Sequence, residues 1–255
     1  MLSRHAFLSA TVLVASISAS FSNVCVAQSD VQPRWTDSTT TKVKPEMRQE
    51  FEGYLRQLMA AYKKAGTPSF LTLETFAGDT TEYTTVVPVM KFGDLDGPSV
   101  VIKVLGEAGW ERLSRNMARC YTAQTRQYAT PQTELEINRT DVPMGIYWVE
   151  TRTLVAPGRM GDYLNWLKND YRPALEKASV ARFQVSQPIF GAVAGEIVTT
   201  RMLKNLAEID GGPVLSKALN DEETRAVGAK AVALVSSSNT RVVRLRIDLS
   251  YSAGK

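Results

Sequence analysis

Polar and charged side chains recur at every second position in two segments of the sequence. In one segment these are Trp148, Glu150 and Arg152, and in the other they are Arg244 and Arg246. Because successive side chains of a β-strand point to opposite faces of a sheet, each run should lie on one face. We predict that these five residues line a polar cavity that binds a small anionic or hydroxylated molecule, with arginine as a bidentate donor.

This interpretation assumes that the valines next to these runs, Val149 and Val243, face the helices of the fold. The alternative is that the same acids and bases pair with each other across the strands, which is common in sheets. Glu82 and Glu196, which recur at matching places along the chain, fit a structural role better than a catalytic one.

A second group of candidates lies in one expected helix and comprises Tyr163, Trp166, Asn169 and Tyr171. An aromatic stripe at helical spacing is typical of a packed core, and a ligand pocket between helix and sheet is the alternative. The matching residues Phe51 and Tyr54 favour the core for two of the four.

The first 27 residues have the layout of a secretory signal peptide. Arg4 and His5 precede an apolar stretch, and small residues lead to Ala27, after which we expect cleavage. A lipid anchor on Cys25 is the rival interpretation, but the residues before it lack a lipobox. We therefore predict an exported protein, periplasmic or extracellular. No segment offers the roughly 20 apolar residues of a membrane-spanning helix.

Removal of residues 1–27 would leave Cys120 as the one cysteine and no histidine. An intramolecular disulfide, a zinc site of His and Cys, a histidine-ligated haem and a Ser-His-Asp triad would then each lack an essential member. We expect no cofactor and no metal, although carboxylate-only sites and catalysis by Glu, Asp, Tyr, Lys or Arg remain open. The number of Lys and Arg residues falls from 30 to 29 against 26 acidic residues, which gives a net charge of +3. The basic residues are scattered among the acidic ones, so the charge does not indicate nucleic-acid binding.

The chain repeats itself. Residues 41–45 align with 153–157 at an offset of 112, and from Glu82 onward the offset is 114, which aligns 134–135 with 248–249. Two long copies indicate a duplicated domain, not a solenoid. We predict a signal peptide at 1–27, a first module at 28–135, a linker at 136–144 and a second module at 145–255.

Each module should run strand, helix, strand, strand, helix, strand. Apolar residues from Met47 to Tyr62 recur at steps of three and four, which predicts a helix after Pro45. The second helices should follow residues 96–99 and 210–213, and Val243, Leu245, Ile247 and Leu249 should share one face of the last strand. Helices on one face of each sheet leave the other face uncovered, so we expect the two sheets to pack face to face as an intrachain barrel.

This doubled βαββαβ pattern resembles the dimeric α+β barrel superfamily of ferredoxin-like proteins in a fused tandem form, near the NIPSNAP-like and antibiotic-monooxygenase-like groups. The resemblance implies an α+β fold over residues 34–250. It also implies a range of activities that includes cofactor-free oxygenases, isomerases and haem enzymes such as chlorite dismutases. Members of the haem branch bind the iron through a histidine, which the mature chain would lack. The resemblance assigns no catalytic residue to this chain.

Two functions are compatible with these patterns. We favour a non-enzymatic module that binds a small molecule or a partner, because the mature chain contains no evident prepared acid, base or nucleophile. The alternative is a cofactor-independent oxygenase or isomerase. An isolated carboxylate with a raised pKa in a water-filled cleft would favour the enzyme. The sequence does not determine the oligomeric state.

Overall fold

The computed structural model describes residues 34–143 and 145–252. The predicted signal peptide, residues 1–27, lies outside the described residues. No helix in the described ranges is long and apolar enough to cross a membrane. We refer to residues 34–143 as the first half and to residues 145–252 as the second half.

The first half follows the predicted order of elements. Its long helix α1 buries Phe51 and Leu55 four residues apart, and it ends before Gly66, whose positive φ of 77° suits glycine at a helix C-terminus. The second helix begins after Ser99, whose side chain accepts a hydrogen bond from the amide of Ile102. The elements are β1 (Trp35–Val43), α1 (Arg48–Lys64), β2 (Ser69–Ala77), β3 (Glu82–Val89), α2 (Val100–Arg119) and β4 (Tyr121–Pro131).

The second half has shorter helices. A single π-helical turn, Leu167–Tyr171, joins α3 to α4. The expected helix after residues 210–213 is only a 3₁₀ turn there, and α6 begins at Asp221 because Asn220 and Glu223 form a capping box. A short strand at the end of the first half, β5 (Ile137–Asn138), pairs with β7 of the second half. The elements of the second half are β6 (Tyr147–Val155), α3 (Met160–Trp166), α4 (Arg172–Lys177), β7 (Arg182–Phe190), β8 (Glu196–Leu203), α5 (Ala207–Asp210), α6 (Asp221–Val232), β9 (Val235–Leu245) and β10 (Tyr251–Ser252).

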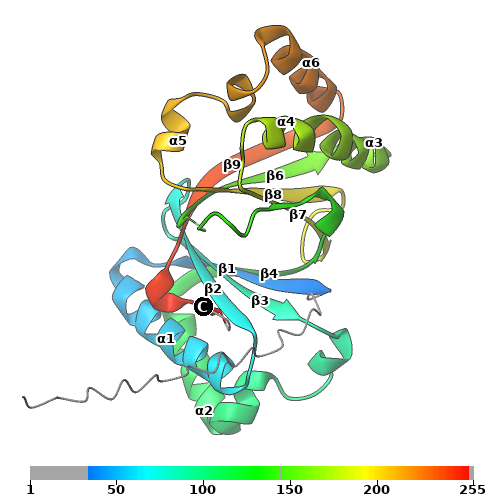
Figure 1. Cartoon of the computed structure of the whole chain (residues 1–255). Helices are drawn as coiled ribbons and strands as arrows, with labels where there is room; N and C mark the ends of the chain where they lie inside the picture. The colour runs from blue at the N-terminus through cyan, green and yellow to red at the C-terminus, as the bar shows by residue number, and fades with distance from the viewer. Residues whose placement is uncertain (1–33, 144, 253–255) are drawn as a thin grey trace, which may run out of the picture. The chain divides into compact units, whose positions relative to one another are not determined.

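Eight of the strands close into an antiparallel barrel. Their order is β2-β3-β1-β4-β7-β8-β6-β9, and β2 also pairs with β9. Thus the two halves meet along both edges, β4 with β7 and β9 with β2. Figure 1 shows α1 and α2 against the outer face of the first four strands, and α3, α4 and α6 against the outer face of the other four. The expected barrel within one chain is therefore present.

Strand register repeats between the halves at the offsets read from the sequence. Asp37 lies opposite Val87 and Tyr128, whereas Val149, 112 residues after Asp37, lies opposite Arg201 and Val242. The partners in β8 and β9 are each 114 residues after those in β3 and β4. This register defines equivalent positions in the two halves.

Three apolar clusters hold the fold together. One lies between α1, α2 and their strands and includes Phe51 and Leu113. A second lies under α3, α4 and α6 and includes Trp166 and Leu175. The third, with Trp148 at its centre, fills part of the barrel interior.

Each half completes the core of the other. Leu135 follows β4 and is buried in the second-half core, where β5 also pairs with β7, so residues 136–144 are not simply a linker. Leu249 follows β9 and is buried in the first-half core, where β10 pairs with β2. The predicted last strand is therefore too long. It ends at Leu245 because a 3₁₀ turn over residues 247–249 redirects the chain, leaving Ile247 exposed.

Candidate functional site

The register of β9 separates the five predicted ligand-binding residues. Trp148 lies opposite Val243, and both belong to the apolar cluster inside the barrel. Val243 therefore faces the barrel interior and not the helices, so the predicted orientation of Arg244 and Arg246 is wrong. Because Val242 and Val243 are adjacent, the sequence pattern allows either of them to face the barrel interior. The pattern alone did not identify Val243 as the residue that does.

Arg244 and Arg246 instead join a charged network between β2 and α1. The Nη2 atom of Arg244 lies 2.6 Å from Oε2 of Glu74, whose side chain is buried. Arg246 donates to both carboxylate oxygens of Glu52, at 2.6 and 2.9 Å. These hydrogen bonds hold the pKa of Glu52 at about 2, and the hydroxyl of Tyr83 donates to the same carboxylate. The network ties the C-terminal segment to the first half.

Trp148, Glu150 and Arg152 line a cavity of about 230 Å³ inside the barrel, here called the barrel cavity. Sequence reasoning missed Arg241, which lies opposite Glu150 and donates to its Oε1 at 2.9 Å. Arg152 also donates to Glu150, at 3.0 Å, and to Glu196, at 2.7 Å. The side chains therefore pair with each other, as the alternative interpretation expected. Ligand binding at Trp148, Glu150 and Arg152 stays a prediction.

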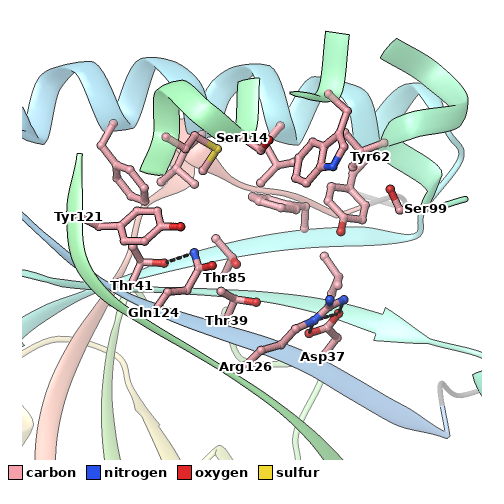
Figure 2. Close-up of a pocket in the computed structure, with 18 residues that line it drawn as sticks. Asp37, Thr39, Thr41, Tyr62, Thr85, Ser99, Ser114, Tyr121, Gln124 and Arg126 are labelled. Atoms are coloured by element: carbon pink, nitrogen blue, oxygen red, sulfur yellow. Dashed lines mark hydrogen bonds and ion pairs between the residues drawn. The ribbon is translucent and has the colours of Figure 1, made fainter. Parts of the chain in front are cut away.

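A different cavity lies between the helices and the sheet of the first half (Figure 2). It has a volume of about 260 Å³, and we call it the helix–sheet cavity. Apolar side chains form most of its walls, and polar side chains of the strands form its floor. The apolar walls include Phe51, Leu55, Leu58, Phe70, Val87, Val101, Trp110 and Met117, and the polar floor consists of Asp37, Thr39, Thr41, Thr85, Gln124 and Arg126.

An ion pair closes one end of this floor. Arg126 donates from Nε to Oδ1 of Asp37 at 2.9 Å and from Nη2 to Oδ2 at 2.5 Å, a bidentate arrangement. The Asp37 side chain is 6% exposed, whereas that of Arg126 is 53% exposed, so the arginine lies at the border with solvent. Farther along the floor, Gln124 donates to Thr41 at 3.0 Å. Figure 2 shows both interactions.

Hydroxyl groups enter the cavity from the helical side as well. Tyr62 of α1, Ser99 at the start of α2 and Ser114 within α2 all line it (Figure 2). Burial, followed by the charge of Asp37, raises the pKa of Tyr62 to about 12. Tyr62 therefore keeps its proton near neutral pH and can donate a hydrogen bond. The cavity can hold a largely apolar molecule and hydrogen-bond to its polar groups.

Sequence reasoning did not identify the helix–sheet cavity. The one available signal was the run of polar residues at alternate positions of β1, namely Asp37, Thr39 and Thr41, on a face that helices cover. A polar strand face beneath an apolar helix face is a mismatch, and such a mismatch is a reason to expect a binding site.

The aromatic residues of the second half form core. Tyr163 and Trp166 are buried, and Trp166 stacks on Tyr171 with ring centroids 5.0 Å apart. Tyr171 in turn meets Phe183 edge-on. Asn169 does not join them and instead lines a shallow pocket between α4 and α6. Within residues 34–143 and 145–252, no group of three or more His, Cys, Asp or Glu side chains is placed to hold a metal ion.

No protein-family model matches the sequence, and no curated protein matches it. Among solved structures, an anthrone oxidase-like protein has a TM-score of 0.60 and 14% identity, covering 88% of this chain and 95% of that chain. A proposed monooxygenase from Lactobacillus acidophilus NCFM has a TM-score of 0.59 and 10% identity, covering 88% and 98%. A mutant chlorite dismutase from Candidatus Nitrospira defluvii has a TM-score of 0.51 and 8% identity, covering 84% and 92%.

These neighbours belong to the dimeric α+β barrel superfamily, and at such low identity they establish the fold alone. The described part of this chain thus has the α+β barrel fold that the sequence resemblance implied.

Proposed function

We propose that the protein binds a small organic molecule in the helix–sheet cavity. The ligand would be largely apolar and would carry one or two hydroxyl or carbonyl groups. The observation that supports this most strongly is the combination of apolar walls from α1 and α2 with a floor of threonine, glutamine and a paired aspartate. Cavities that bind small molecules typically combine apolar walls with a few placed polar groups.

The polar groups of the cavity favour binding over proton transfer. Asp37 is held in a bidentate pair with Arg126, and both of its oxygens accept hydrogen bonds. With both oxygens occupied by the guanidinium, this carboxylate is poorly placed to take a proton from a ligand, because a general base must lie within hydrogen-bond reach of that proton. Tyr62, with its pKa of about 12, acts as a hydrogen-bond donor and not as a base.

A cofactor-independent oxygenase is the second candidate, and the monooxygenase and oxidase names of two structural neighbours favour it. Haem chemistry of the histidine-ligated kind does not fit the donor set. The single histidine, His5, is outside the described residues, and the buried thiol of Cys120 donates to the backbone oxygen of Asn116. We derive no step through a haem.

The proposal extends to the origin and location of the protein. We propose that residues 1–27 direct export and are removed, which the n, h and c layout of the sequence supports. We also propose that the two halves are tandem ferredoxin-like modules from one duplication, related to the NIPSNAP-like group. The offsets of 112 and 114 between equivalent strands support the duplication.

Calorimetric titration with 1-naphthol, a bicyclic apolar probe with one hydroxyl, tests the binding. Ser114→Leu should fill the cavity and weaken binding at least tenfold. The matched control Arg115→Leu places the same side chain at the next position of α2, where the arginine is 68% exposed, and should leave binding unchanged. Equal affinity of the wild-type protein and Ser114→Leu would contradict the proposal.

Native mass spectrometry of protein purified from its own host should show a retained small molecule that Ser114→Leu loses. An oxygen electrode separates the two candidate functions. Oxygen uptake that depends on the protein and on this retained molecule would replace the binding proposal with the oxygenase. Binding without oxygen uptake would support the binding proposal.

A further inference from the structure

Arg201 is an unusual arginine of the second half. It lies near the end of β8, its side chain is only 16% exposed, and burial lowers its pKa. The nearest carboxylate, that of Glu208, is 3.9 Å from Nη1, which is beyond hydrogen-bond distance. Within the described ranges no protein group accepts a hydrogen bond from the guanidinium of Arg201. Its nitrogen atoms are not sealed from solvent, so water or an anion in the space beside them supplies the missing acceptors.

A cavity of about 210 Å³ lies beside this guanidinium, and we call it the Arg201 cavity. Lys204 and Lys217 also line it, so three cations face one carboxylate, that of Glu208. Glu208 is already engaged, because it accepts a hydrogen bond from the backbone amide of Lys204 at 3.0 Å. The lining therefore has a net charge of +2, which an oxyanion with two negative charges would balance.

The turn between α4 and β7 adds a second, independent observation. Ser179 lines the Arg201 cavity and has a φ of 58°, which makes it the one non-glycine residue in the described ranges with a positive φ. The equivalent position after α1 is Gly66, and the same pair of backbone hydrogen bonds closes both helix ends. Glycine is preferred there, and a residue with a Cβ pays a conformational cost. The serine places a hydroxyl at the cavity where the first half has none.

From these observations we propose that the Arg201 cavity binds a small doubly charged oxyanion such as phosphate or a phosphate monoester. Arg201 would donate two hydrogen bonds to it, and Lys204, Lys217 and the hydroxyl of Ser179 would complete the site. A planar guanidinium suits bidentate recognition of an oxyanion. The ammonium groups of Lys204 and Lys217 add charge at the rim, and that of Lys217 already donates to the backbone oxygen of Glu208. The site is separate from the helix–sheet cavity, so its test does not depend on the proposed function.

Thermal unfolding of the full protein with inorganic phosphate at pH 8, compared with sodium chloride at equal ionic strength, tests the site. Phosphate should raise the Tm more than chloride, because a ligand that binds only the folded state stabilises it. Arg201→Met should raise the Tm without phosphate, because it removes one of three neighbouring cations, and should weaken phosphate binding at least tenfold. The control Arg159→Met replaces an arginine that is 48% exposed and should keep the phosphate response.

A second variant keeps the test decisive if Arg201→Met does not fold. Ser179→Gly should also raise the Tm without phosphate, since it relieves the left-handed backbone, and should weaken phosphate binding several-fold. The proposal is wrong if phosphate stabilises no more than chloride, if acetate stabilises as well as phosphate, or if Arg201→Met retains the wild-type response.

Discussion

The two halves share their register and strand order, yet they treat the space between helices and sheet differently. In the first half, Asp37 and Arg126 place an ion pair on the sheet, and a cavity of about 260 Å³ lies above it. At the equivalent positions the second half has Val149 and Thr240. There the rings of the second-half aromatic residues pack into the core.

The charge at these two strand positions decides whether aromatic rings can close over the sheet there. A paired carboxylate and arginine must remain close to water or to polar partners, whereas the uncharged Val149 and Thr240 allow rings to close over the sheet. One fold can therefore hold a cavity above these two strand positions in one half and packed aromatic rings at the equivalent place in the other.

The largest effect should come from separating the halves. We predict that the first half expressed alone as residues 28–140 will be insoluble or will dimerise, because it loses Leu249 from its core and leaves the strand edges of β2 and β4 unpaired. The intact protein should unfold in one transition that two optical probes report identically. A folded monomeric half with the Tm of the full protein would show that the halves are independent.

An intermediate effect should come from Glu52, because its equivalent in the second half is Leu164. The folded-state pKa of Glu52 is about 2, below its ordinary value of 4.5, mainly through hydrogen bonds from Arg246. Its contribution to stability is therefore fully present above pH 4.5 and is lost as the pH falls toward 2.

We predict that Glu52→Gln lowers the free energy of unfolding by about 1–3 kcal/mol at pH 7, as for a partly buried ion pair that loses one member. It should also flatten the decline in stability between pH 4.5 and 2. Urea unfolding across this pH range measures both effects. The control Glu111→Gln removes an exposed pair and should change stability by less than about 0.5 kcal/mol. An unchanged acid profile in Glu52→Gln would assign the acid sensitivity to other carboxylates.

The smallest effect should come from a matched pair of substitutions at the equivalent threonines. Thr85 lines the helix–sheet cavity, and Thr199 holds the same place beneath the aromatic core. We predict that Thr199→Leu costs about 1 kcal/mol through overpacking, whereas Thr85→Leu costs less because space is available. Urea unfolding compares the two variants. A larger cost for Thr85→Leu would mean that the cavity in the first half cannot accept added volume.

Much of the fold could be predicted from the sequence, because helix periodicity and the repeated register depend on local pattern. The strand offsets of 112 and 114 agree with the observed pairing. The sequence could not predict which residues of β9 face the barrel interior. Val242 and Val243 are adjacent, and both faces of the strand are covered. Only the pairing of Trp148 with Val243 reveals which arginines enter the barrel.

The candidate sites were harder to predict than the fold. Asp37 and Arg126 lie 89 residues apart in sequence and meet only because β1 pairs with β4. Likewise, the shortage of hydrogen-bond acceptors around Arg201 depends on several segments packed around it. Neither arrangement leaves a local pattern along the chain.

The burial of Leu249 in the first-half core has a consequence for the order of biosynthesis. Ribosomes release a chain from its N-terminus, and the N-terminal part of a protein commonly folds first. Here the segment that completes the core of the first half follows β9, and its contacts reach back across the 194 residues between Arg246 and Glu52. The first half must therefore wait, incompletely packed, until the ribosome has also made the second half as far as Leu249.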